Sequence, residues 1–354
     1  MDGQGSAARV SFRNDYSEGA HPRLLQALVQ ASAEQNAGYG TDRHTARAVT
    51  LIRKAIAQPH ADVHLLVGGT QTNLTAIAAF LRPHQAVIAV EAGHIATHET
   101  GAIEATGHKV LTVPALHDKL TPALIQPVLD AHGNEHMVQP RLVYVSNSTE
   151  SGTIYTRAEL EALSRCCRAN DLLLYLDGAR LGAALTADGN DLDLPAIAGL
   201  TDAFYIGGTK NGALLGEALV ILNPALQTDF RYLIKQRGAL LAKGMVLGTQ
   251  FATLFEDGLF FELAAHANAM AQRLRAGLLA AGAQFSSDSP TNQQFIAVSA
   301  QHAAQLALRY DFERWEVRAD GSLVIRFVTS WATTPAAVDR LSADVAALLQ
   351  DPAL

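Results

Sequence analysis

In the stretch "YIGGTKNGALLGEALVI" (Tyr205–Ile221), Lys210 is the one charged side chain between Asp202 and Glu217. It stands among glycines and aliphatic residues, where burial of an ammonium group is costly unless the charge is paired or lost. A solvated surface lysine would have polar neighbours. The pattern therefore predicts a lysine that acts as a neutral nucleophile next to a buried strand.

Short apolar runs on both sides of this stretch predict the fold. Their apolar residues are continuous rather than alternating, which indicates strands covered on both faces of a sheet. The runs read VHLLVG, AVIAVE, KVLTV, RLVYVSN, LLLYLD, AFYIGG and EALVIL. Helical patterns at 45–57, 71–81, 157–169 and 193–199 fit the crossovers of a mostly parallel sheet. The predicted class is α/β, with ligands expected at the carboxyl ends of the strands.

The pattern changes after about Pro224. Residues 229–255 and 258–282 are predicted to form long helices, and 334–350 a final helix. Asp320-Gly321, between two apolar runs, is a hairpin signal. The later segments therefore predict a small α+β unit. The expected division is an N-terminal arm (1–20), a large domain (21–255) and a small C-terminal α+β domain (256–354).

Composition narrows the classes of partner. Of the 354 residues, 49% are hydrophobic and 17% charged, and the net charge of -7 argues against nucleic acid. No apolar run approaches the roughly 20 residues of a membrane span. The polar start, MDGQGSAARVSFRNDYSEG, predicts no secretory signal. Cys166 and Cys167 are adjacent and are expected to be reduced thiols, so the expected location is cytoplasmic.

A glycine turn marks a candidate anion site in "LLVGGTQTNLTAIAAFL" (65–81). Gly68 and Gly69 allow a tight turn, and Thr70 is predicted to cap the following helix. The free N–H groups of 70–72 would then face an anion, helped by the helix dipole. The alternative is an ordinary Gly-Gly turn with a threonine cap. Neither a P-loop nor a Rossmann glycine pattern occurs in the sequence.

Asp177 ends an apolar strand in "LLLYLDGARLGAAL" (172–185). Its partner is either Arg180, three residues on, or the ring nitrogen of a cofactor. Lys210 follows the next strand, so both side chains are expected at one sheet edge. An amine, a carboxylate and a phosphate cradle together suggest pyridoxal phosphate.

Seven ordered stretches from residue 12 to about 341 resemble the low-specificity L-threonine aldolases, fold-type-I pyridoxal-phosphate enzymes of the β-eliminating lyase group. They read FRNDYSEGAHPRLLQAL, AGYGTDRHTARAVTLI, GGTQTNLTAI, EAGHIATHETGAIEATGHKV, LDGARLGAAL, GGTKNGALLGEALVI and VIRFVTSWATTPAAVDRL. The resemblance implies a large domain with a mostly parallel seven-stranded sheet.

The resemblance also implies roles in holding the cofactor. Lys210 would bind the cofactor's aldehyde covalently, and Asp177 would pair with the pyridine nitrogen. Arg180 would lie beside the phenolic oxygen, and His94 would stack on the ring face. The phosphate would be held by Gly69, Thr70 and Gln71.

Substrate and subunit contacts follow from the same resemblance. Arg326, with Arg180, would bind the substrate carboxylate in the bidentate manner of guanidinium groups. Asn14 takes the place of a family serine near the substrate. Tyr39 would lie near a subunit interface, because family members complete their sites within homodimers or homotetramers. Without the resemblance, His94 would be interpreted as an ordinary histidine at a helix start and Arg326 as half of an ion pair.

Two departures from the family pattern concern the substrate. Many members have a histidine in "ENTHNG", a candidate base near the β-hydroxyl, where this chain has "SNSTESGT" (146–153). Thr149, Glu150 or a water molecule are the alternatives for that role. Many members also have an arginine in "GGMRQ" that reaches the neighbouring subunit's phosphate. Here "AKGMVLG" (242–248) offers Lys243 instead, and both departures suggest a subgroup that prefers bulkier substrates such as phenylserine.

The implied reaction is retro-aldol cleavage of L-threonine, L-allo-threonine or a related β-hydroxy-α-amino acid to glycine and an aldehyde. His94, or a water held near it, is the candidate base. The alternatives are another pyridoxal-phosphate lyase, a transaminase, and a non-catalytic module. The chemically most distant rival is a metal-dependent hydrolase using "HGNEH" (132–136), but Gly133 and Asn134 predict a loop there rather than a ligand-bearing helix. In "HIATHE" (94–99) the histidine pair lacks a third ligand, so no metal site is expected.

Overall fold

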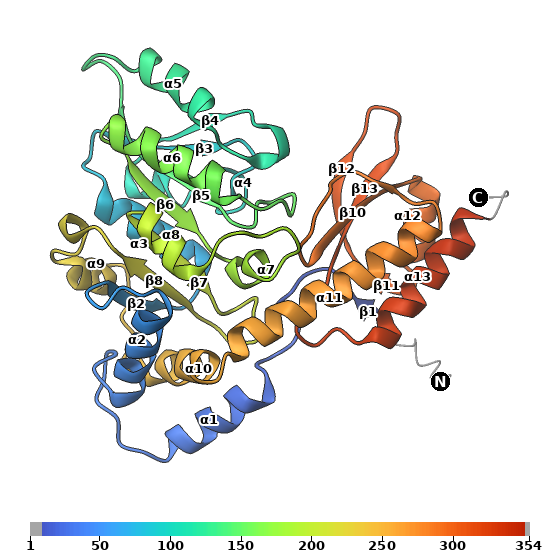
Figure 1. The fold of residues 1–354 in the computed structure, drawn as a ribbon, viewed down its shortest axis with the longest axis horizontal. Helices are drawn as coiled ribbons and strands as arrows, with labels where there is room; N and C mark the ends of the chain where they lie inside the picture. The colour runs from blue at the N-terminus through green and yellow to red at the C-terminus, as the bar shows by residue number, and fades with distance from the viewer. Residues whose placement is uncertain (1–8, 351–354) are drawn as a thin grey trace, which may run out of the picture.

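The computed structural model describes residues 9–350, and its larger part is built on a seven-stranded sheet (Figure 1). Of the predicted arm and small domain, residues 1–8 and 351–354 lie outside the described residues. The strand order is β2-β8-β7-β6-β5-β3-β4. The strands are β2 (Asp62–Leu66), β3 (Gln85–Val90), β4 (Val110–Val113), β5 (Gln139–Ser146), β6 (Leu173–Asp177), β7 (Ala203–Gly207) and β8 (Glu217–Ile221).

The sheet is mostly parallel, as predicted. Strands β4, β3, β5, β6 and β7 pair in parallel, whereas β8 pairs antiparallel with both β7 and β2. The carboxyl ends of β5, β6 and β7 therefore meet at one edge, with Ser146 opposite Asp177. This confirms the α/β class.

Both faces of the sheet are covered, which explains the continuous apolar runs. On β6, Leu174 and Leu176 pack into one core while Leu173 and Tyr175 pack into the other. The first core is completed by α2 (Arg43–Ala55), α5 (Pro122–Ala131), α6 (Arg157–Ala169), α8 (Leu194–Leu200) and α10 (Met245–Glu256). The second is completed by α3 (Gly69–Phe80), α4 (His94–Thr97) and α9 (Phe230–Gln236). Two further helices, α1 (Pro22–Ser32) and α7 (Leu181–Leu185), pack at the first core.

The smaller part is an antiparallel sheet with its own core. Its strand order is β12-β13-β10-β9, and a two-stranded β1-β11 pair lies beside it. Phe12 is buried in this core, so part of the N-terminal arm packs with the C-terminal unit. The elements are β1 (Val10–Ser11), β9 (Gln284–Phe285), β10 (Gln293–Val298), α12 (Ala300–Leu306), β11 (Tyr310–Asp311), β12 (Glu313–Val317), β13 (Leu323–Val328) and α13 (Pro335–Leu349).

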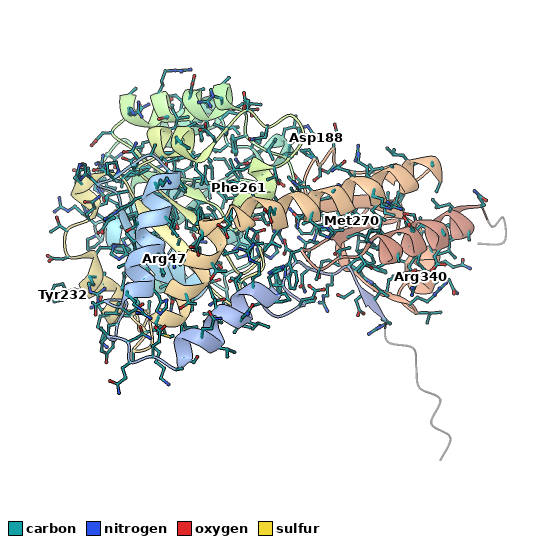
Figure 2. All side chains as sticks on the ribbon, turned by 60° about the horizontal axis from the view of Figure 1, so that its bottom comes forward. Arg47, Asp188, Tyr232, Phe261, Met270 and Arg340 are labelled. Atoms are coloured by element: carbon teal, nitrogen blue, oxygen red, sulfur yellow. The ribbon has the colours of Figure 1, made fainter. Side chains whose placement is uncertain are left out.

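One long helix, α11 (Leu259–Ala280), connects the two parts (Figure 2). Leu259 and Phe260 near its start pack into the large core, whereas Leu274 and Leu278 pack into the small core. The helix confirms the prediction for 258–282. One helix thus contributes to both cores, and the division at residue 255 stays a prediction.

Two local predictions are wrong. Residues 229–255 are not one helix: α9 ends at Gln236, and Gly238 takes a left-handed φ of 68° that terminates it before α10 begins. Thr70 does not cap α3, because the N-cap is Gly68 and no side chain caps that end. The hairpin prediction is confirmed, since Gly321, with φ of 81°, lies in the turn between β12 and β13.

The ends of β6 and β7 approach so closely that side chains are excluded there. A Cβ atom on Gly178 would overlap the carbonyl oxygen of Tyr205, and one on Gly207 would overlap that of Ala179. Because neither glycine has a Cβ atom, the Gly207 N–H donates to the Gly178 carbonyl at 2.9 Å. The two glycines therefore fix the spacing of the two strand ends. This spacing positions Asp177, which ends β6, and Lys210, which follows β7.

We expect Gly207→Ala to destabilise the protein by at least about 2 kcal/mol, because backbone atoms must move to admit the methyl group. Gly199→Ala is the matched control. Gly199 lies in α8, and no neighbouring atom lies within 4 Å of the place that an added methyl group would take, so alanine there should be neutral or stabilise by up to about 1 kcal/mol. Urea unfolding measures both, and equal stability of the two variants would contradict the close-approach argument.

Candidate active site

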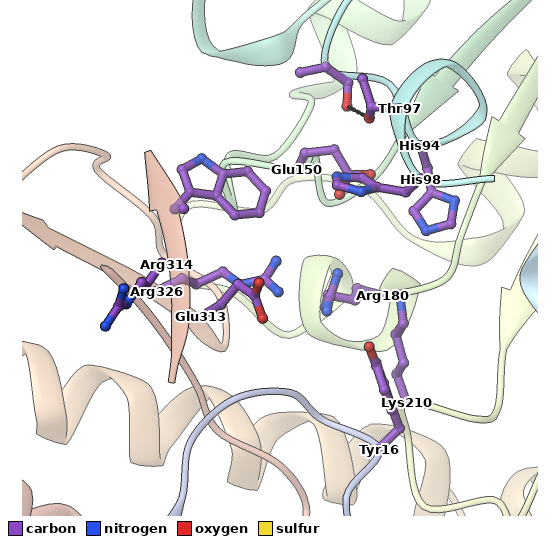
Figure 3. A pocket seen from close by; sticks show the side chains of 12 residues that line it. Tyr16, His94, Thr97, His98, Glu150, Arg180, Lys210, Glu313, Arg314 and Arg326 are labelled. Atoms are coloured by element: carbon purple, nitrogen blue, oxygen red, sulfur yellow. Dashed lines mark hydrogen bonds between the residues drawn. The ribbon is translucent and has the colours of Figure 1, made fainter. Parts of the chain in front are cut away.

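Two adjoining cavities lie at the carboxyl edge of the large sheet. The inner cavity, about 350 Å³, is lined by Gly68, Gly69, Thr70, Asp177, Thr209 and Glu217 among others. The outer cavity, about 550 Å³, lies between the two parts of the chain and is lined by Glu313, Arg314, Trp315 and Arg326. Six residues line both: Tyr16, His94, His98, Glu150, Arg180 and Lys210. Figure 3 shows the outer cavity, with Arg326 across from His94, His98 and Arg180.

Lys210 follows β7 and lies where the two cavities meet. Within residues 9–350 its amine forms no hydrogen bond or ion pair, and the ring of Tyr16 lies 5.9 Å from Nζ. Burial and the nearby Arg180 lower the pKa of Lys210, although Asp15, Glu150 and Asp177 oppose the shift. The arrangement favours a free amine, which is the nucleophilic form.

Asp177 is held by four donors. Oδ1 accepts from the Tyr205 hydroxyl at 2.6 Å and the Ala179 N–H at 3.0 Å. Oδ2 accepts from the Tyr144 hydroxyl at 2.5 Å and the Asn73 amide at 3.0 Å. Burial raises the pKa of Asp177, but His94 and these hydrogen bonds outweigh it, so the net shift is downward. Asp177 is therefore a fixed, charged carboxylate facing the inner cavity.

Arg180 is not the partner of Asp177. Its guanidinium binds Asp15 in bidentate fashion, Nε to Oδ2 at 2.7 Å and Nη2 to Oδ1 at 3.0 Å. The interpretation of an Asp177–Arg180 pair is therefore wrong. Arg180 still lines both cavities, and its contacts with the cofactor and the substrate stay predictions.

A polar network fixes the orientation of His94. Glu99 Oε1 lies 2.8 Å from His94 Nδ1 and accepts from the Asn73 amide, also at 2.8 Å. Asn73 therefore bridges Glu99 and Asp177. Burial lowers the pKa of His94, but the bond to Glu99 and the charges of Asp177 and Glu150 raise it more. A charged imidazolium is favoured beside the cavity.

The predicted anion site is an uncapped helix end. Gly69 and Thr70 open α3, and both line the inner cavity. Since no side chain caps this end, its first N–H groups are available to an anion. Gln71 is absent from the cavity lining, and its Oε1 accepts from Val67 N–H at 3.3 Å.

Arg326 enters the outer cavity from β13. Its Nη1 donates to Gln293 at 3.1 Å, and the guanidinium lies 4.7 Å from the centre of the Trp315 ring. Its buried Nε has no partner within residues 9–350. A guanidinium that lines the cavity suits a carboxylate, and the predicted contact with the substrate stays a prediction.

Three other predicted residues do not line either cavity. Asn14 turns to its own loop, where Oδ1 accepts from Tyr16 N–H and the Ser17 hydroxyl. Tyr39 is 44% exposed, and Lys243 is also exposed. Their proposed contacts to substrate or to a second subunit therefore stay predictions.

The segment 146–153 presents Glu150 to the cavities. Thr149 is not in their lining, and its hydroxyl is 2.7 Å from that of Thr153. Glu150 lines both cavities, is 8% exposed, and has no side-chain partner in the described part of the chain. Of Thr149 and Glu150, the two residues considered in place of the missing histidine, Glu150 is the one whose side chain lines the cavities.

The rival motif "HGNEH" forms a loop after α5, as Gly133 and Asn134 predict. The His132 ring nitrogen Nδ1 lies 2.8 Å from the Val128 carbonyl oxygen. Across residues 9–350 no group of three or more metal-ligating side chains is brought together. Over the same residues no helix combines the length and apolar character that crossing a bilayer requires.

Sequence reasoning missed most of the residues that support the site. Asp15, Asn73, Glu99, Tyr144 and Tyr205 act through contacts between segments far apart in the chain. One of them could have been found from the sequence. Tyr205 opens the lysine stretch on the strand that follows Asp177, so its hydroxyl could be expected near that carboxylate. Trp315, on β12, also lines the outer cavity and was not predicted as a site residue.

Comparison with known proteins agrees with this geometry. The family model for β-eliminating lyases matches residues 12–301. The chain belongs to the β-eliminating lyase family. It is 35% identical to a low-specificity L-threonine aldolase of a Pseudomonas species, with 96% of this chain and 97% of the relative covered.

Solved structures extend the likeness to the whole fold of this β-eliminating lyase. A threonine aldolase of Leishmania major matches with a TM-score of 0.95 and 51% identity, over 96% of this chain and 99% of the other. An aspartate aminotransferase of Thermus thermophilus matches with a TM-score of 0.73 at 16% identity, over 98% and 92%. The second likeness shows the fold alone, which is that of fold-type-I pyridoxal-phosphate enzymes.

We expect NMR titration of the cofactor-free protein to give His94 a pKa above the ordinary value of about 6.5, and Glu99→Gln to lower it. His21 is the internal control, since burial lowers its pKa and neither Glu99 nor His94 is among the causes; burial also lowers the pKa of His98. Because the folded pKa of His94 is raised, its contribution to stability is present below about pH 6.5 and is lost as the pH rises through the folded value. A His94 that titrates below His98 would contradict the network.

Proposed function

We propose that this chain is a pyridoxal 5'-phosphate-dependent aldehyde-lyase that cleaves L-threonine, L-allo-threonine and related β-hydroxy-α-amino acids, phenylserine included, to glycine and an aldehyde. One observation carries the proposal: the unpaired Lys210, the fixed carboxylate of Asp177 and the uncapped start of α3 surround one inner cavity. The names of the relatives support the same reaction.

The donor set suits the three groups by which pyridoxal phosphate is held. Lys210 supplies an amine for the aldehyde, and Asp177 supplies a carboxylate for the pyridine nitrogen. Gly69 and Thr70 supply N–H groups for the phosphate. His94 lies beside the same cavity, where it would cover a ring face.

When bound, the cofactor accepts the electron pair released as the Cα–Cβ bond breaks. The chain's own residues orient the substrate and move its protons. Arg326, which lines the outer cavity, binds the carboxylate through its guanidinium. Glu150 takes the β-hydroxyl proton as the aldehyde forms, since the network that favours the charged form of His94 makes its imidazole a poor base. Asp177 keeps the pyridine nitrogen protonated because its own carboxyl stays charged.

Incubation of the holoenzyme with L-threonine or phenylserine tests the reaction. Retro-aldol cleavage releases glycine and an aldehyde, whereas β-elimination releases a keto acid and ammonia. We expect glycine in amounts equal to the aldehyde, and Lys210→Ala should reduce its release about 10³-fold or more. A keto acid as the main product, or full activity of the alanine variant, would overturn the proposal.

The outer cavity supports activity on substrates with aromatic side chains. Trp315 lies there against Arg326, and its ring centre is 6.4 Å from that of His98. We expect Trp315→Ala to lower kcat/KM for phenylserine about fivefold more than for threonine, because an aromatic contact contributes roughly 1 kcal/mol. Val317→Ala, an exposed change on the same strand, is the control. An equal loss for both substrates would show that Trp315 does not select the side chain.

We also propose that the enzyme is a cytoplasmic homodimer or homotetramer whose subunits share active sites. Tyr39, Tyr232 and Leu240 line an exposed, largely apolar hollow that a second subunit would cover. Lys243, exposed in the single chain, would then reach the partner's phosphate. The support for these assignments is the family resemblance together with this surface.

A further inference from the structure

Glu217 is a buried acid in the inner cavity to which the proposed reaction gives no role. It opens β8, opposite Gly207 of β7 and Leu66 of β2. The residue is 4% exposed, and it lines the same cavity as Gly69 and Thr70 at the start of α3. The acid therefore shares the inner cavity with the helix start that is proposed to hold the phosphate, and its pairing with Leu66 places it beside the strand that leads into that helix.

The carboxyl of Glu217 lacks the partners that would suit a buried anion. Its Oε2 accepts a hydrogen bond from Gly208 N–H at 3.1 Å, and the Thr209 hydroxyl is the other neutral donor beside it. Within the described chain no Lys, Arg or His nitrogen lies within 4 Å of it. A carboxylate in this position would carry a charge in a site that burial makes unfavourable.

The ionisable groups around Glu217 come from three elements. Lys210 follows β7, Tyr205 lies on β7, and Asp177 and Tyr175 lie on β6. The segment from the end of β2 into α3 that lines the cavity, residues 67–70, contributes no charged side chain to it within the described residues. Burial raises the pKa of Glu217 to about 8, and the Thr209 hydroxyl, Lys210 and the Gly208 N–H only partly offset this.

A protonated Glu217 suits a phosphate better than a charged one does. The phosphate group has a second pKa of about 6 and is therefore largely a dianion above neutral pH. A carboxylate within the same small cavity would repel it. A carboxylic acid instead offers one O–H donor in addition to its accepting oxygen.

We propose that Glu217 stays protonated when the cofactor binds and donates its O–H to the phosphate group. The inference rests on the proposed cofactor. No bond to the proton is broken: it remains on the carboxyl oxygen while that oxygen donates to a phosphate oxygen. Glu217 is thus a phosphate-binding acid that complements the N–H groups of α3.

The test compares pyridoxal phosphate with pyridoxal, which lacks the phosphate. The affinity of each for the cofactor-free protein is measured from pH 6.5 to 9.5. The affinity for pyridoxal phosphate divided by the affinity for pyridoxal reports the phosphate contacts alone, because both compounds react with Lys210 in the same way. For the wild type we expect the ratio to fall above about pH 8, by up to tenfold per pH unit. For Glu217→Gln, which is always uncharged and always a donor, we expect no fall and a ratio at pH 7 within about threefold of the wild type.

Two further variants complete the design. Glu217→Ala lacks the donor, so its ratio at pH 7 should be about tenfold lower than that of the wild type. Glu161→Gln makes the same chemical change on the surface of α6 and should follow the wild type at every pH. Circular dichroism checks that each variant is folded.

A wild-type ratio that is constant across this pH range overturns the inference, as does an equal fall in Glu217→Gln. These results leave the proposed function intact, provided that pyridoxal phosphate still binds. No binding of pyridoxal phosphate at any pH defeats the proposed function as well. If Glu217→Gln does not fold, isotope-edited infrared spectra of the wild type decide: the protonated carboxyl signal of a buried glutamate must persist at pH 7 after binding, and its disappearance overturns the inference.

Discussion

The structure depends on the close approach of β6 and β7 at their carboxyl ends. Gly178 and Gly207 permit it, because any side chain at either position would overlap the neighbouring backbone. The approach places the carboxylate that ends β6 and the amine that follows β7 at the same cavity. The site is therefore a product of main-chain packing first and of side-chain chemistry second.

The site favours opposite ionisation behaviour in its two central groups, a charged carboxylate and an uncharged amine. Asp177 is kept ionised in a buried position by four donors, whereas Lys210 has no partner within residues 9–350 and is favoured as a free amine. The network through Asn73 and Glu99 connects Asp177 to His94, so the carboxylate and the imidazole are oriented together. Arg326 comes from the smaller part, across the outer cavity. The two parts of the chain thus meet at the substrate side of the site, whereas the inner cavity is lined mainly by the larger part.

Much of the fold could be predicted from the sequence, because strands buried on both faces leave continuous apolar runs. The convergence of Lys210 and Asp177 could also be predicted, since strand-end polar residues in an α/β chain meet at one edge. The partner of Arg180 was not: Asp15 lies on the N-terminal arm, far away in the chain, and local spacing favoured Asp177 instead. The helix break at Gly238 and the cap at Gly68 were missed because helical periodicity does not register a single left-handed or extended residue.

The central claim is that Lys210 is the amine that joins the cofactor. Borohydride reduction of the pyridoxal-phosphate-loaded protein, followed by proteolysis and mass spectrometry, tests it most directly. The account predicts a single modified peptide, carrying the reduced cofactor on Lys210. A modification on any other lysine, or a reduced protein that carries no cofactor, would contradict it.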